Sequence, residues 1–123
     1  MPNQIILQEI KKAVGAHAAW KLKLTTAVSR GRTKLDPATV KCDDQCDFGK
    51  WLYGPTIDND LKSGMPYKVI TRLHAEFHVC ASKILEQVIQ GDMTAASVQL
   101  EGDYTERTEK LMRALKKWKG ELS

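Results

Sequence analysis

Three histidines and three cysteines are the residues of this chain whose types and spacing point to chemistry. His74 and His78 lie four residues apart in the segment HAEFH. On a helix, side chains at that spacing stand one above the other on one face, with Cβ atoms about 5–6 Å apart. Two ring nitrogens can then meet one metal ion, so the pair has the geometry of a chelate.

His17 is the only other histidine, and it falls on the apolar stripe of the N-terminal segment. The helical periodicity therefore predicts that all three imidazoles point into the same interior. A lone buried histidine is usually a core residue with a satisfied hydrogen bond. Three that converge from two helices would each need a polar partner, since an unpaired buried group costs about 1–3 kcal/mol. A shared metal ion would remove that cost.

Cys46, in the segment CDFGKWLYG at residues 46–54, is the best candidate for a fourth ligand. Zinc is satisfied by four nitrogen and sulfur ligands in a tetrahedron. At or just before a helix start, the thiolate is favoured by the helix dipole and far more by the metal. Three neutral imidazoles and one thiolate also reduce the charge that must be buried. The predicted zinc ligands are His17, Cys46, His74 and His78.

The surroundings of this predicted zinc site are also suggested by the sequence. Trp20 and Trp51 lie close to the ligands in sequence and are expected to wall the site with apolar surface, rather than to stack on nucleic acid bases. A carboxylate could orient the imidazoles, and five acidic residues are candidates for this role: Asp43, Asp44, Asp47, Asp58 and Glu76.

Helical periodicity dominates the long segments that must position the ligands. Apolar side chains three or four residues apart predict one helix over residues 5–30 and another from Pro66 to Gly91. The expected buried seams are Ile6, Ile10, Ala13, Val14, Leu24, Ala27 and Val28 in the first and Ile70, Leu73, Phe77, Ala81, Ile84 and Val88 in the second.

Shorter elements and a last long helix complete the predicted organisation. Asp36 could cap a short helix near residues 36–42, and residues 46–54 predict one or two helical turns. Residues 56–65 are expected to form a polar linker. Asp92 is a candidate cap for the last helix, whose expected seam is Val98, Thr105, Thr108, Leu111, Leu115, Trp118 and Leu122.

Together these elements predict an all-α fold, because no convincing alternating strand accompanies them. The expected architecture is an antiparallel four-helix bundle with an additional short helical turn that carries Cys46. At 123 residues the chain is expected to form one domain, residues 1–123. Helices of this length can pair along a shared face, and we therefore expect a homodimer.

Composition and charge exclude several classes of protein. No apolar run approaches the roughly 20 residues of a membrane span, and the N-terminus does not resemble a signal peptide, so we expect no membrane insertion and a cytoplasmic location. An odd number of cysteines argues against a disulfide framework. The net charge of +4 is modest, and the cations of the last helix are interpreted as a solvated face rather than a nucleic acid site.

Enzyme classes with helical metal sites are also disfavoured. The metalloprotease motif H-E-x-x-H places its glutamate directly after the first histidine, whereas Glu76 stands one position later and cannot act as that general base. A catalytic zinc keeps one position open for water, which four protein ligands would close. Di-iron and oxygen-carrying bundles use more histidines or paired Glu-x-x-His elements. We therefore expect that the protein is not an enzyme.

The segments HAAW (residues 17–20), CDFGKWLYG (46–54) and HAEFH (74–78), in this order, resemble the bacterial chemoreceptor zinc-binding (CZB) domain family. The intervening lengths extend the resemblance over nearly the whole chain. It implies an α-helical bundle, often dimeric, and a zinc-ligand role for the four residues that match the family's ligands: His17, Cys46, His74 and His78.

The same resemblance implies a regulatory role. Family members are attached to cytoplasmic chemoreceptors or diguanylate cyclases, or stand alone. They are thought to report zinc availability, or oxidant attack on the zinc-bound cysteine. A purely structural zinc that staples the helices together is the alternative, since both roles need the same ligands.

Two features depart from the simplest family pattern. Cys42 and Cys80 are extra thiols: Cys42 could compete for the metal or form a disulfide after oxidation, and Cys80 is expected to pack as a small hydrophobic residue. No signalling or catalytic domain follows Ser123, so we expect either a standalone member that acts through a partner or an excised sensor.

Overall fold

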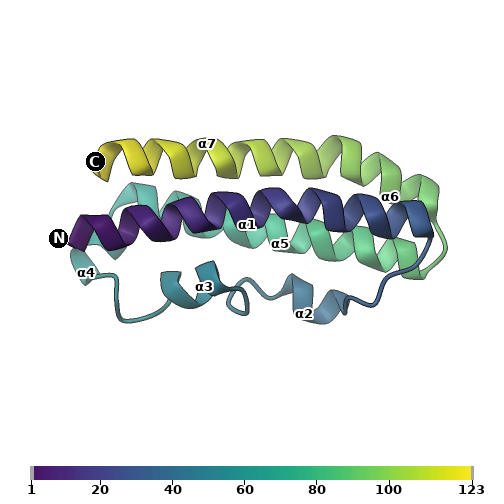
Figure 1. The fold of residues 1–123 in the computed structure, drawn as a ribbon, viewed down its shortest axis with the longest axis horizontal. Coiled ribbons are helices and arrows are strands. Elements are labelled where there is room, and N and C mark those ends of the chain that lie inside the picture. Colours follow the sequence, from purple (N-terminus) through teal and green to yellow (C-terminus); the bar gives the residue numbers. More distant parts are fainter. Residues whose placement is uncertain (1, 123) are drawn as a thin grey trace.

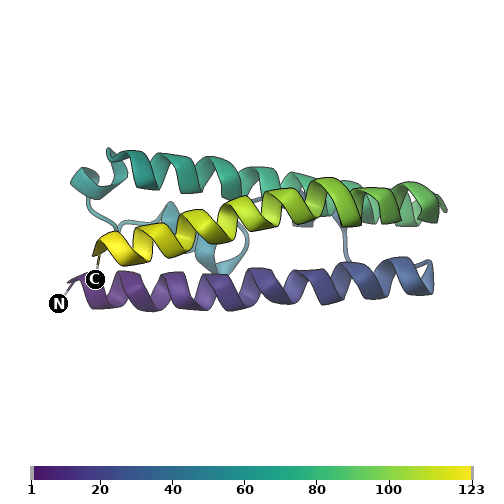
Figure 2. The same cartoon turned by 90° about the horizontal axis from the view of Figure 1, so that it is seen from above.

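The computed structural model describes residues 2–122, and all their regular structure is helical (Figure 1). Three long rods run side by side (Figure 2). The first is α1 (Pro2–Arg30) and the second is α5 (Met65–Ile89). The third is continuous through α6 (Met93–Gln99), the π-helical turn η1 (Leu100–Tyr104) and α7 (Thr105–Leu122). The prediction of an all-α bundle is confirmed.

Two short helices form the fourth side of the bundle. After α1 the chain returns along the bundle through α2 (Pro37–Lys41) and α3 (Asp47–Leu52), and α5 then runs in the same direction as α1 (Figure 1). The successive segments therefore alternate in direction, as an antiparallel four-helix bundle requires. As predicted, the Asp36 carboxylate caps α2, accepting a hydrogen bond from the Ala38 amide at 3.1 Å.

The seams predicted for the two long helices face the core, although Ile6, Val14 and Val28 of α1 are only half-buried. Among them, Ile10 and Leu24 of α1 and Ile70 and Ile84 of α5 are at most 1% exposed. Asp92 caps α6 as expected, since its carboxylate accepts a hydrogen bond from the Ala95 amide. Within residues 2–122, no helix combines the length and apolar character that a bilayer span demands.

Two expectations about the connections and the last rod are wrong. The predicted polar linker contains a one-turn helix, α4 (Asn59–Lys62), because the Asp58 carboxylate caps it by accepting a hydrogen bond from the Leu61 amide at 2.8 Å. Val98 was expected in the last seam but is 67% exposed. It lies thirteen residues before Leu111, about 3.6 helical turns, and therefore points to another side.

The buried face of the last rod runs through residues spaced four apart across η1. This face contains Ala96, Leu100 and Tyr104, and continues into α7 through Leu111, Leu115 and Trp118. Of the other predicted seam residues, Thr105, Thr108 and Leu122 are half-buried.

Candidate metal centre

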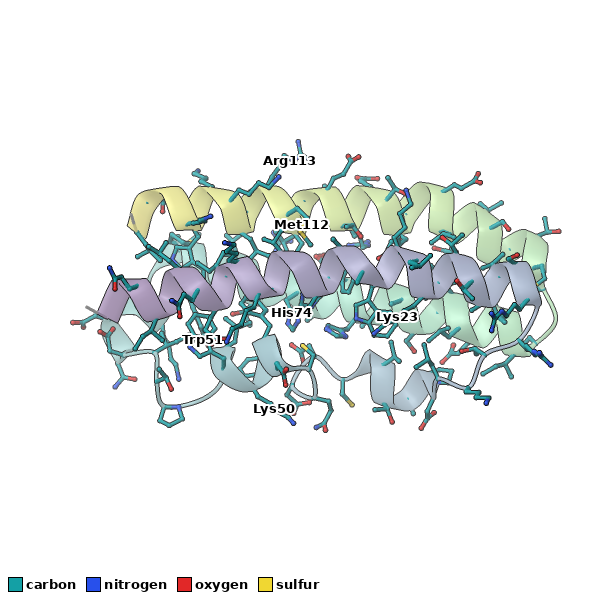
Figure 3. The ribbon with its side chains drawn as sticks, viewed as in Figure 1. Lys23, Lys50, Trp51, His74, Met112 and Arg113 are labelled. Carbon is teal, nitrogen blue, oxygen red and sulfur yellow. The ribbon has the colours of Figure 1, made fainter. Side chains whose placement is uncertain are left out.

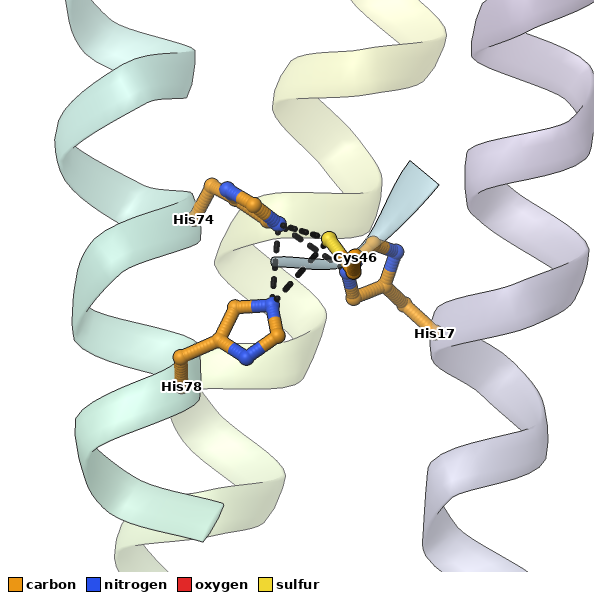
Figure 4. A group of neighbouring side chains, drawn as sticks. All are labelled: His17, Cys46, His74 and His78. Atoms are coloured by element: carbon orange, nitrogen blue, oxygen red, sulfur yellow. Dashed lines mark hydrogen bonds between the residues drawn. The ribbon is translucent and has the colours of Figure 1, made fainter. Parts of the chain in front are cut away.

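The four residues singled out in the sequence lie together inside the bundle (Figure 4). His17 comes from the middle of α1, Cys46 from the residue before α3, and His74 and His78 from successive turns of α5. Their ligand atoms, the histidine nitrogens and the cysteine sulfur, all lie within 4.8 Å of one another. Figure 3 shows His74 and Trp51 between the long helices and α3.

The His74 Nε2 atom is the centre of this cluster. It lies 3.1 Å from Nε2 of His17, 3.0 Å from Nε2 of His78 and 3.3 Å from Sγ of Cys46. The Cys46 sulfur is also 3.6 Å from Nε2 of His78. Ligands around a tetrahedral zinc are separated by about 3.3 Å for two nitrogens and about 3.5 Å for nitrogen and sulfur. Four of the distances between donor atoms are therefore close to those that one zinc ion would impose.

Burial keeps the three imidazoles uncharged at neutral pH. The rings are at most 3% exposed, and Phe48 and Phe77 pack edge-on against His17. Desolvation lowers the pKa of His17 to about 4 and that of His74 to about 2, and it also lowers the pKa of His78. Neutral imidazole is the form that binds a metal.

Backbone carbonyls determine which ring nitrogen faces the cluster. Nδ1 of His17 lies 2.8 Å from the Ala13 carbonyl oxygen, and Nδ1 of His78 lies 2.9 Å from that of Val40. A carbonyl oxygen only accepts hydrogen bonds, so each Nδ1 must carry the proton and donate it. In a neutral ring, Nε2 then holds a lone pair. Both lone-pair nitrogens belong to the cluster of donor atoms.

His74 is held differently. Its Nδ1 is buried and has no hydrogen-bond partner among the residues that the structure describes. If its proton were on Nε2, it could donate to only one of the three acceptors around it. The cluster therefore gathers more acceptors than its own protons can satisfy, and a cation at its centre would satisfy all of them.

Five carboxylates were candidates to orient the imidazoles, but within residues 2–122 backbone oxygens occupy this position at His17 and His78. Glu76 is turned away from the cluster and accepts a hydrogen bond from Arg107 at 3.0 Å. Asp43 acts at longer range: burial lowers the pKa of His78 and raises that of Cys46, and the negative charge of Asp43 opposes the first shift and adds to the second. Sequence could not identify Ala13 and Val40, since every residue has a carbonyl group and only the fold aims it.

The start of α3 positions the Cys46 sulfur. Cys46 is the N-cap residue of that helix, and its Sγ accepts a hydrogen bond from the Gly49 amide at 3.3 Å. Burial raises the pKa of the thiol, and the amides of Gly49 and Phe48 oppose that rise. Without a metal, the thiol is therefore protonated at neutral pH.

Gly49 allows α3 to lie against the loop that precedes it. A methyl group at this position would collide with the carbonyl oxygen of Asp43. We therefore expect Gly49→Ala to destabilise the zinc-loaded protein by about 1–3 kcal/mol and to weaken zinc binding, because the backbone around Cys46 must shift. Urea unfolding at fixed free zinc measures the first effect, and chelator competition measures the second.

Gly15 provides the matched control for this substitution. It also lies in a helix, and a methyl group there would meet no atom within 4 Å. Gly15→Ala should leave zinc binding unchanged and stabilise the protein by about 0.5–1 kcal/mol. Equal zinc affinity in the two alanine variants would show that the close approach at Gly49 does not position the sulfur.

An open groove leads from the surface to one side of the cluster. It has a volume of about 640 Å³ and is lined by Trp20, His17 and Cys46, among others. Trp20 therefore borders the approach to the site, as expected. Trp51 lies one layer away, since it packs against Phe48 with ring centroids 5.7 Å apart.

The other two cysteines lie outside the cluster. Cys42 is exposed, and its thiol donates to the Ala38 carbonyl at 3.4 Å. Cys80 is buried, as expected for a small hydrophobic residue, but its thiol also donates to an oxygen of Asp103 at 3.5 Å. Burial and the charge of Asp103 raise its pKa to about 12, so it remains a thiol.

Comparison with known protein families agrees with this arrangement. The sequence model of one family, described as the chemoreceptor zinc-binding domain, matches residues 17–85. This is more than half of the chain and includes all four clustered residues. No curated protein and no solved structure gave a significant match. The chain belongs to the chemoreceptor zinc-binding domain family, a family of regulatory zinc-binding domains.

Proposed function

We propose that the chain is a zinc-dependent signalling domain whose zinc ligands are His17, Cys46, His74 and His78. One observation carries this proposal: donor atoms from three separate segments converge in a buried position, and the hydrogen bonds of His17 and His78 leave Nε2 lone pairs there. In the absence of a cation this arrangement would be unfavourable, because neighbouring lone pairs repel and lack donors.

The donor set selects zinc among the common ions. Three imidazole nitrogens and one thiolate form the mixed nitrogen and sulfur set that zinc prefers, whereas calcium and magnesium prefer oxygen ligands. The cluster contains no carboxylate among the described residues. Four protein ligands also leave no position for a metal-bound water, which supports a regulatory role rather than an enzymatic one.

Accessibility of Cys46 supports sensing at this sulfur. The side chain is half-buried and borders the open groove, while the three histidines are almost fully buried. Hypochlorous acid can convert a thiolate into a sulfenic acid with release of chloride. The sulfur loses two electrons and gains the hydroxyl oxygen, and the chlorine gains the two electrons. A sulfenic acid is a weaker metal ligand, so oxidation would loosen the site.

Oxidation of the zinc-loaded protein tests this route. The double variant Cys42→Ser/Cys80→Ser keeps Cys46 as its only thiol, and we expect it to release zinc with hypochlorous acid as fast as the wild type does. In Cys46→Ser, loaded with zinc at micromolar concentration, hypochlorous acid should add markedly less zinc release to the rate measured without oxidant. A metallochromic dye follows the release. Loss of the response in the double variant, or equal release from Cys46→Ser, would assign oxidant sensitivity to another group.

A purely structural zinc is the second candidate function, because the four residues join α1, α3 and α5. The hydrophobic core, however, extends on both sides of the metal centre, through Ile10 and Leu24 in α1 and Ile70 and Ile84 in α5. We therefore expect zinc removal by graded chelators to leave the protein largely helical, with altered packing near α3. Circular dichroism and amide exchange check this. Unfolding that coincides with zinc release would support a structural staple instead.

The wider biological role is proposed on the basis of the family. We propose that residues 1–123 form a single cytoplasmic domain that acts in chemotaxis or cyclic-di-GMP signalling, through a chemoreceptor or a diguanylate cyclase partner. A homodimer is part of the same proposal. It is supported by the length of α1, 29 residues, which would allow two copies to pair along it.

A further inference from the structure

A second concave site lies where α1 ends and the chain turns toward α2, at the right of Figure 1. This open cleft, which we call the basic cleft, has a volume of about 560 Å³. Its lining brings together four cations and two threonines: Lys23, Arg30, Arg32, Lys34, Thr26 and Thr33. It contains no carboxylate among the described residues.

The segment that contains the basic cleft is strongly positive. Residues 21–41 contain six cations and a single carboxylate, Asp36, which gives this segment a net charge of +5. The whole chain has a net charge of +4. The remainder of the molecule therefore has a net charge of −1, although residues 110–119 of α7 contain five cations and no carboxylate. The basic cleft differs from that stretch because four of its cations line one concavity, where they attract anions together.

The four cations of the basic cleft make no ion pair with any residue that the structure describes. The carbonyls at the C-terminal end of α1 account for a cation at Arg30, in the last turn. They do not account for Arg32 and Lys34, which belong to the following loop. Mutual repulsion of these cations would be offset by a bound anion.

The local backbone geometry also places a hydrogen-bond donor near these cations. Gly31 adopts a left-handed conformation, with a φ of 69°, and reverses the chain after α1. The hydroxyl of Thr33 accepts a hydrogen bond from the Leu35 amide at 3.0 Å, so its own proton remains available to a ligand. Guanidinium groups bind phosphate oxygens in pairs, which suits Arg30 and Arg32 to such a ligand.

We propose that the basic cleft binds a small soluble phosphorylated molecule. Its volume is within the usual range for small-molecule sites, about 300–1,000 Å³, and its cations surround one concavity rather than following an extended stripe, which a nucleic acid would need. Lys23 also lies over the ring of Trp20, at 4.6 Å, and lines the groove that leads to Cys46. The anion site and the metal centre are therefore neighbours along α1.

Titration of the zinc-loaded full chain, labelled with nitrogen-15, tests the proposal. The probes are inorganic phosphate and ADP, added at constant ionic strength and followed by the amide resonances. We expect saturable shifts centred on residues 26–35, with tighter binding of ADP because it carries more phosphate charge. Shifts that grow without saturation, or that centre elsewhere, would overturn the proposal. Saturable binding of a single-stranded RNA without any response to ADP would also overturn it.

Two double variants that lose the same charge distinguish a specific anion-binding site from nonspecific electrostatic attraction. Arg30→Gln/Arg32→Gln should weaken ADP binding about tenfold or more, since each arginine supplies charge-assisted hydrogen bonds. Lys116→Gln/Lys117→Gln removes the same charge from exposed positions of α7 and should change the affinity by less than about twofold. Both variants change exposed side chains, and their amide spectra verify folding. Equal weakening in the two variants would contradict the assignment.

Discussion

Cys46→Ser is expected to weaken zinc binding by about a hundredfold or more, while Cys42→Ser leaves it unchanged. Structural zinc sites have apparent binding free energies of about 10–16 kcal/mol at pH 7, so each of four ligands contributes several kcal/mol on average. The serine hydroxyl is a poor replacement, because it stays protonated and is a harder ligand than thiolate. Competition with a chromophoric chelator measures the affinity.

The two cysteines are close to ideal controls for each other. They lie four residues apart on the same short stretch of chain, but only Cys46 is in the cluster of donor atoms. A comparable loss of affinity in both variants would indicate that the two thiols share or exchange the metal. An unchanged zinc affinity of Cys46→Ser would show that the Cys46 sulfur is not a zinc ligand.

Zinc affinity is expected to rise about tenfold for each pH unit between pH 7 and pH 9. A metal binds the deprotonated ligand, so every group that is protonated in the zinc-free protein must release a proton. The pKa of His17 is about 4 and that of His74 about 2, and the pKa of His78 is also lowered, so the imidazoles release none in this range. The Cys46 thiol, whose pKa is raised above 9.0, releases one.

The direction of this pH dependence follows from the single proton that the Cys46 thiol releases. Lower pH favours the thiol and competes with zinc, and the slope becomes steeper only at acidic pH, near the lowered pKa values of the imidazoles. Chelator competition at several pH values gives the slope. Calorimetry in buffers of different ionisation enthalpy gives the proton count independently. Release of two or more protons at pH 8 would show that an imidazole is charged in the zinc-free protein, and release of none would exclude the thiol.

Much of this structure could be predicted because helical periodicity and metal-ligand spacing are local properties of a sequence. The four-residue spacing of His74 and His78 places both on one helical face, and the apolar stripe around His17 defines another. The caps at Asp36 and Asp92 follow from the preference of carboxylates for helix N-termini, and both are present. Such signals need no information about tertiary contacts.

Features that depend on how segments meet could not be predicted in this way. The carbonyls that orient His17 and His78 belong to Ala13 and Val40, whose side chains carry no sign of this role. The collision that requires Gly49 involves the backbone of Asp43, six residues earlier. In each case the chain folds back on itself, and only the path of the backbone shows which atoms become neighbours.

The convergence of cations in the basic cleft could not be predicted either. The cations of the last helix were predicted to form a solvated face; those at residues 110–119 are exposed, and Figure 3 shows Arg113 pointing away from the bundle. The convergent cations come instead from the end of α1 and from the loop after Gly31. The left-handed turn at Gly31 brings the two groups together, and net charge alone does not reveal such a turn.

X-ray absorption at the zinc K-edge of the zinc-loaded protein tests the central claim most directly, because it counts the atoms bound to the metal. The proposed site predicts a single sulfur at about 2.3 Å and three nitrogens at about 2.0 Å, with imidazole scattering from three rings. A spectrum with oxygen ligands and no sulfur, or with two sulfurs and fewer imidazoles, would contradict the assignment of His17, Cys46, His74 and His78.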